Sequence, residues 1–134
     1  MRVINLTGYP DAEVRRLVRY GMRGLTVGKI TVTIKPGRKH SKGIAYYTRR
    51  RGIVIWVAPA NRFPRLGWKR HRGGVMNHDW QNWQEALVAL AAHEGRHYDL
   101  WATRRRHESV QAEEMACEAW ERHRLDAYRL EQAA

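Results

Sequence analysis

The segment that most constrains the fold of this chain is AAHEGRHYDL, residues 91 to 100, which places two histidines four positions apart. In an α-helix, side chains at positions i and i+4 lie on the same face, one turn apart. The imidazoles of His93 and His97 can therefore converge on one metal ion if this segment is helical. Glu94 projects from the neighbouring side of the same turn, from where its carboxylate can reach a water at the metal without binding the metal itself.

The residues around this motif predict the helix that it requires. The stretch of residues 79 to 101 starts at Asp79, an acceptable N-cap, and has an apolar face formed by Trp83, Leu87, Leu90, Tyr98 and Trp101. Steps of three or four residues lead from Ala86 to His93 and His97, so both histidines lie on the inward-facing stripe. Chance would supply only about 0.02 matches to HExxH in a chain of this composition. Zinc is the expected ion, because imidazole and carboxylate ligands suit it best in a tetrahedral site.

Two histidines leave a zinc site incomplete, and a second predicted helix, beginning near Ser109, offers the missing ligand. If this helix packs antiparallel against the first, a carboxylate in its first turns faces the metal, and Glu113 and Glu114 are placed there. We prefer Glu114. The small Cys117 then lets the helices approach, and Glu118 can hold a histidine through its second ring nitrogen. Glu113 stays open as the alternative, because it shares a helix face with Cys117.

The N-terminal half of the chain predicts one helix and three strands. Residues 11 to 22 have one apolar helical face, with Asp11 as a plausible N-cap. Three runs rich in β-branched and aromatic residues follow, at 29–35, 44–48 and 52–59. Residues 49 to 52 are short enough for a hairpin. The sequence therefore predicts an α+β fold: an N-terminal helix, a three-stranded and largely antiparallel sheet, the HEGRH helix and a C-terminal glutamate helix.

Composition predicts one globular domain spanning residues 1 to 134. A hydrophobic fraction of 43% with six tryptophans argues against disorder. The longest apolar run, Ala86 to Ala92, is too short to span a bilayer, and the N-terminus lacks the apolar core of a signal peptide. Cys117 is the only cysteine, so no intrachain disulfide can form. We therefore expect a soluble protein in a reducing, cytoplasmic location.

The charge of the chain predicts an affinity for polyanions. Twenty-five Lys and Arg against 13 Asp and Glu give a formal charge of +12. Residues 60 to 79 show no sustained period and predict a long loop. Between residues 62 and 72 this loop interleaves cations with aromatic rings, namely Arg62, Phe63, Arg65, Trp68, Lys69, Arg70 and Arg72. Such a pattern suits phosphates and unstacked bases, so nucleic acid is a predicted partner. A solvated loop whose aromatics pack on the core is the alternative.

The motif and its spacing resemble a known family. HEGRH, then a 16-residue spacer, then Glu114 ahead of Cys117 and Glu118 resembles the gluzincin pattern of zinc peptidases. The order of elements is similar to that of minigluzincins and of small zincin-like proteins from phages and bacteria, including SprT-like and ImmA-like relatives. An SprT-type site would need a third histidine in a His-Gly context, and His107, the nearest candidate, is not followed by glycine.

This resemblance implies a zincin-like fold and a zinc metalloendopeptidase. His93, His97 and Glu114 would bind Zn2+, and Glu94 would act as the general base that takes a proton from water and passes it to the leaving amine. We expect an extended polypeptide substrate to pair with the edge of the strand from Ile53 to Val57.

Two points remain open from the sequence. A donor that stabilises the oxyanion is required, and His123, Tyr128 and His78 are candidates. The second function class is a non-catalytic, zinc-stabilised module that binds nucleic acid. Glu94 favours the enzyme, because a purely structural zinc site has no need of a carboxylate beside its first histidine.

Overall fold

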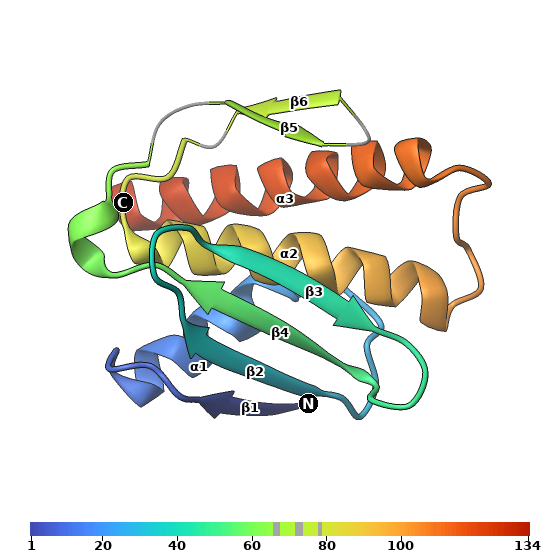
Figure 1. The fold of residues 1–134 in the computed structure, drawn as a ribbon, viewed down its shortest axis with the longest axis horizontal. Helices are drawn as coiled ribbons and strands as arrows, with labels where there is room; N and C mark the ends of the chain where they lie inside the picture. Colours follow the sequence, from blue (N-terminus) through green and yellow to red (C-terminus); the bar gives the residue numbers. More distant parts are fainter. Residues whose placement is uncertain (66–67, 72–73, 78) are drawn as a thin grey trace.

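The predicted α+β class is confirmed by the computed structural model, which describes residues 1–65, 68–71, 74–77 and 79–134 (Figure 1). Between residues 66 and 78, only the backbone of the two strands β5 and β6 is described. The elements in chain order are β1 (Arg2–Asn5), α1 (Asp11–Gly21), β2 (Thr31–Pro36), β3 (Lys42–Tyr46), β4 (Gly52–Val57), the 3-10 helix η1 (Ala60–Arg62), β5 (Trp68–His71), β6 (Gly74–Asn77), α2 (Trp83–Ala102) and α3 (Val110–Ala133).

The main sheet has four strands in the order β1-β2-β4-β3. β1 runs parallel to β2, and β2 runs parallel to β4, whereas β3 and β4 form the predicted antiparallel hairpin. The prediction of a three-stranded, largely antiparallel sheet is therefore wrong in strand number and direction. The sequence analysis missed β1 because RVIN is only four residues long. β4, which reads GIVIWV, is apolar almost throughout, as befits a strand between two neighbours.

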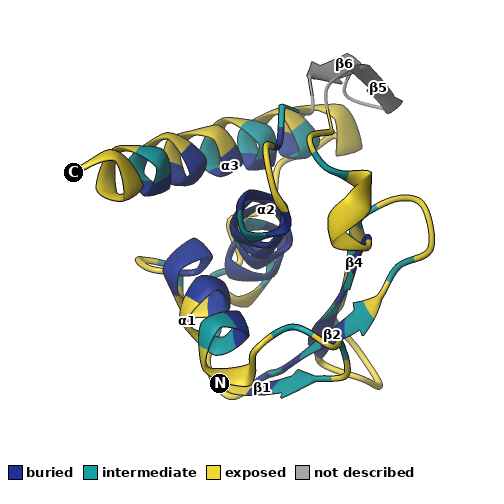
Figure 2. Ribbon diagram, turned by 90° about the vertical axis from the view of Figure 1, so that its left-hand side faces the viewer, coloured by how far each residue is buried: buried dark blue, intermediate teal, exposed yellow. Residues whose placement is uncertain are grey.

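Helix α2 is the centre of the molecule. Figure 2 shows it end-on, with α1, α3 and the sheet around it. Its residues are buried on nearly every side, including both histidines of HEGRH. α1 and α2 cover one face of the sheet, where alternate residues of β2 and β4 are buried, among them Val32, Ile34, Ile53 and Ile55. A helix in this position presents side chains to several neighbours at once, so its motif residues can meet groups from distant parts of the chain.

Side-chain hydrogen bonds cap α2 and α3, and two predicted N-caps, Asp11 and Asp79, are wrong. α2 is capped by Asn82, whose side chain accepts from the backbone N–H of Glu85, and not by Asp79. α3 begins behind Ser109 as expected, with the Ser109 hydroxyl accepting from the N–H of Ala112. α1 follows Pro10 without a side-chain cap. No helix within the described ranges has both the length and the apolar character needed to cross a membrane.

The stretch predicted as a long loop is partly ordered into strands. Antiparallel β5 and β6 form a hairpin, and a bridge between Arg65 and Trp80 closes its base. Phe63 packs against the core, whereas Arg62 is exposed. Arg72 and His78 lie outside the described residues, and only the backbone is described for Trp68, Lys69 and Arg70. Nucleic-acid binding by residues 62 to 72 therefore stays a prediction.

Gly21 allows α1 and α2 to approach closely, which gives a test of the packing. A Cβ at this position would lie 2.6 Å from the carbonyl oxygen of Val88 and 2.9 Å from Cβ of Ala91. Gly21→Ala should therefore lower the free energy of unfolding by about 1–3 kcal/mol through overpacking. Gly8→Ala is the control, because a Cβ there would meet nothing within 4 Å. Urea unfolding followed by circular dichroism measures both; equal stability of the two variants would contradict this packing.

Candidate metal centre

Helices α2 and α3 run antiparallel (Figure 1), and between them three side chains that can ligate a metal come together. Nε2 of His97 lies 2.7 Å from Oε1 of Glu114, and Nε2 of His93 lies 3.3 Å from Oε2 of the same carboxylate. One potential ligand atom from each residue falls within 4.8 Å of the others. The two histidines are buried and Glu114 is half-buried. The structure thus brings together the three residues that the sequence analysis selected as ligands.

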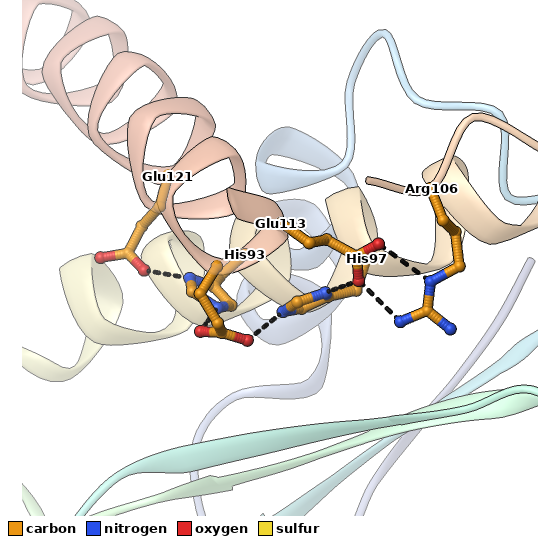
Figure 3. Close-up of polar contacts among 6 residues, drawn as sticks. His93, His97, Arg106, Glu113 and Glu121 are labelled. Carbon is orange, nitrogen blue, oxygen red and sulfur yellow. Dashed lines mark hydrogen bonds and ion pairs between the residues drawn. The ribbon is translucent and has the colours of Figure 1, made fainter. Parts of the chain in front are cut away.

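The other ring nitrogen of each histidine faces a second carboxylate (Figure 3). Nδ1 of His93 lies 3.0 Å from Oε1 of Glu121, and Nδ1 of His97 lies 2.8 Å from Oε2 of Glu113. The sequence analysis gave this role to Glu118, which is not the partner of either Nδ1. Glu113, the alternative third ligand, lies instead on the outer side of His97. Spacing explains the arrangement, because residues 113, 117 and 121 follow one another by four along the face of α3 that packs on α2.

This pattern of hydrogen bonds fits a cation between the two helices. Ionised carboxylates only accept hydrogen bonds, so each Nδ1 donates its N–H and each Nε2 of a neutral imidazole is left with a lone pair. Both lone pairs face the Glu114 carboxylate, which is also an acceptor. Groups that only accept repel one another unless a metal ion or protons lie between them. Two imidazole nitrogens and a carboxylate oxygen are a ligand set that zinc prefers.

The pKa values of these side chains also indicate that the site favours positive charge. Burial by itself lowers the pKa of His93, but the contacts with Glu114 and Glu121 outweigh it and raise this pKa to about 10. Burial also opposes protonation of His97, and Glu114 again reverses the effect, so its pKa is raised. The two imidazoles hold the pKa of Glu114 well below its usual range. Burial raises the pKa of Glu121, and the hydrogen bond with His93 acts in the opposite direction.

Glu113 is held in place by a cation from the loop between α2 and α3. Nε of Arg106 donates to Oε1 of Glu113 at 2.9 Å, and Nη2 donates to Oε2 at 2.6 Å (Figure 3). The guanidinium also lies over the ring of Tyr47, 4.6 Å from its centroid. Such a two-pronged contact fixes a carboxylate in both position and direction. Arg106 therefore orients His97 through Glu113.

Glu94 lies beside the two histidines, where the edge strand β3 meets α2. Its side chain is buried, and a Cβ on Gly43 of β3 would lie only 2.6 Å from Cγ of Glu94. Glycine is thus needed at this point for the strand to reach the helix. A cleft of about 550 Å³ opens here, lined by Gly43, Ile44, Ala45, Tyr47, Glu94, His97, Arg106, His107, Glu108, Ser109, Val110, Glu113 and Glu114. Glu94 and two of the proposed ligands, His97 and Glu114, therefore line one cleft.

Two of the three proposed oxyanion donors, His123 and Tyr128, do not line this cleft. His123 is exposed on α3 beside Trp120, and Tyr128 packs edge-on against Tyr20 in the core. His78 lies outside the described residues.

Sequence reasoning also missed Glu121 and Arg106. The four-residue spacing along α3 is a signal that could have found Glu121, whereas Arg106 comes from an irregular loop whose path no periodicity predicts.

Comparisons of the chain with protein-family models, with curated proteins and with solved structures find no match. The likeness to gluzincins therefore stays a prediction that rests on the HEGRH motif and on its spacing from Glu114.

The carboxylates behind the histidines should control metal affinity. Glu121→Gln and Glu113→Gln should each weaken zinc binding about 10- to 100-fold, because partners of a ligating imidazole's other nitrogen fix its tautomer and orientation. His93→Ala should lose most of the zinc. Competition with a chromophoric chelator measures the affinities. Glu118→Gln, on the same helix, is the matched control, and a larger loss in this control than in Glu121→Gln would contradict the observed pairing.

Proposed function

We propose that this protein is a zincin-like, zinc-dependent metallopeptidase that hydrolyses peptide bonds, with Glu94 as general base. The observation that carries the proposal is the convergence of His93, His97 and Glu114 at a cleft that His97, Glu114 and the buried Glu94 line. A structural site would close the coordination sphere with protein groups, and it would not need a further carboxylate at the cleft.

The chemistry divides between the metal and the chain. Zinc, when bound, supplies a Lewis acid that lowers the pKa of water and polarises a carbonyl. Glu94 accepts a proton from the attacking water and returns it to the leaving nitrogen, so one carboxylate serves as base and then as acid. Its burial against Gly43 limits the positions that its side chain can take. Glu113 and Glu121 hold the two imidazoles in the orientation that ligation requires.

The substrate pairs with β3 rather than with β4. The sequence analysis expected pairing along Ile53 to Val57, but that strand lies between β2 and β3, so neither of its edges is free. β3 ends the sheet, and its residues Gly43 to Ala45 line the cleft beside Glu94. An extended polypeptide added to this edge would be held by its backbone, with weak selection of side chains.

His107 is the donor that we assign to the oxyanion in this cleft. It lines the cleft from the loop ahead of α3 and forms no hydrogen bond or ion pair with the residues that the structure describes. Arg106 lines the same cleft, but its guanidinium is bound to Glu113. A ring free to donate is the kind of group that stabilises negative charge on a carbonyl oxygen.

Glu94→Gln separates catalysis from metal binding. The variant should keep its zinc and its fold, because Glu94 is not a ligand in this account, while losing the proton acceptor. Cleavage of an unfolded substrate such as casein should fall about 10²- to 10⁴-fold. Zinc content and thermal unfolding are measured on the same samples, and chelator-treated wild type gives the background. Equal, low cleavage by wild type, variant and chelated protein would refute the peptidase and favour a non-catalytic zinc module.

A further inference from the structure

We propose that a second cleft, at the C-terminal end of α2, binds single-stranded nucleic acid. This basic cleft has a volume of about 590 Å³ and is lined by Thr26, Val27, Gly28, Lys29, Arg51, Tyr98, Trp101, Ala102 and Arg104. None of these residues lines the cleft at the metal centre. Three segments far apart in the sequence meet here: the loop before β2, the turn between β3 and β4, and the end of α2.

The cations of the basic cleft are not neutralised. Lys29, Arg51 and Arg104 are exposed, and none of them forms an ion pair with the residues that the structure describes. No carboxylate of the described ranges lines this cleft, in contrast to Arg96 and Arg106, which are paired with acids. The sequence explains the excess, because no Asp or Glu occurs between positions 13 and 79. Unpaired cations in a concave surface focus a positive potential that attracts phosphates.

The floor of the basic cleft is aromatic. Trp101 is half-buried, and the guanidinium of Arg51 lies 5.3 Å from the centroid of its ring. Contacts with Tyr47 and Tyr98 hold the indole in place, at 5.6 and 5.4 Å between ring centroids. An indole held in place, in a cleft that Lys29, Arg51 and Arg104 also line, offers an aromatic surface for a base and partners for the phosphates on either side of it. An acidic peptide would use the charges but not the ring, so nucleic acid is the occupant that these features favour.

Arg104 occupies a backbone position that favours glycine. Two backbone hydrogen bonds close the C-terminal end of α2. The N–H of Arg104 donates to the carbonyl of Trp101, and the N–H of Arg105 donates to the carbonyl of Leu100. Arg104 itself has a φ of 57°, in the left-handed region. Glycine is the usual residue at this point of such a helix end, because a side chain there is strained. The chain instead places a cation there, at the mouth of the basic cleft.

The left-handed backbone conformation of Arg104 allows the charge to be tested separately from stability. Arg104→Gly removes the charge and places glycine where the backbone favours it, so the fold should not be weakened. The probe is a fluorescein-labelled oligothymidylate of about 15 nucleotides, titrated by anisotropy at increasing salt. Lys29→Ala/Arg104→Gly is compared with Arg38→Ala/Lys39→Ala, which removes the same charge from the turn between β2 and β3, at the opposite end of β3. Binding does not involve the metal centre, so it should be unchanged in the presence of chelator.

The expected result is a difference between the two double variants. Lys29→Ala/Arg104→Gly should reduce the slope of log affinity against log salt by about 1.4, or about 0.7 for each phosphate that the protein no longer neutralises. Its melting temperature should be no lower than that of wild type, which rules out unfolding as the cause. Arg38→Ala/Lys39→Ala should leave the slope unchanged. Equal reductions in both variants, no binding at low salt, or equally effective displacement by polyglutamate of matched length would each overturn the proposal.

Discussion

The structure depends on two pairs of buried polar groups between α2 and α3, His93 with Glu121 and His97 with Glu113. Each carboxylate fixes which nitrogen of its histidine carries the proton, and thereby turns the other nitrogen toward Glu114. Burying charged groups is costly unless they are paired. Among the residues that the structure describes, only Arg106 adds a permanent positive charge to these pairs through an ion pair, so the arrangement calls for a cation where the three potential ligands meet.

The rest of the fold brings this pair of helices to an open cleft. Cys117, fully buried and small, lies between Glu113 and Glu121 and lets α3 approach α2. On the other side of α2, Gly43 lets the edge strand β3 reach Glu94. In the strand order β1-β2-β4-β3, β3 lies at an edge of the sheet. We propose that a substrate backbone pairs with this edge. The proposed catalytic groups therefore lie between a rigid helix pair and a free strand edge.

Local sequence signals predicted the helices, whereas the strand pairing and the contacts between helices depend on residues far apart in the sequence and were predicted less well. HEGRH, the cap at Ser109 and the apolar periods gave α2 and α3 to within a few residues, because helical hydrogen bonds and side-chain spacing are local. β1 is too short to be recognised alone, and its parallel pairing with β2 depends on the crossover through α1. The sequence analysis named Glu118 and missed Glu121. Both lie within two turns of Glu114, and only the rotation of α3 against α2 decides which of them meets a histidine.

The most direct test of this account is X-ray absorption spectroscopy at the zinc edge on the purified, zinc-loaded protein. The account predicts two imidazoles and oxygen ligands at about 2.0–2.1 Å, with no sulfur contribution, because Cys117 does not belong to the group of converging ligand atoms and burial raises the pKa of its thiol. A sulfur shell near about 2.3 Å, or a spectrum without imidazole scattering, would contradict the assignment of His93, His97 and Glu114 as the ligands.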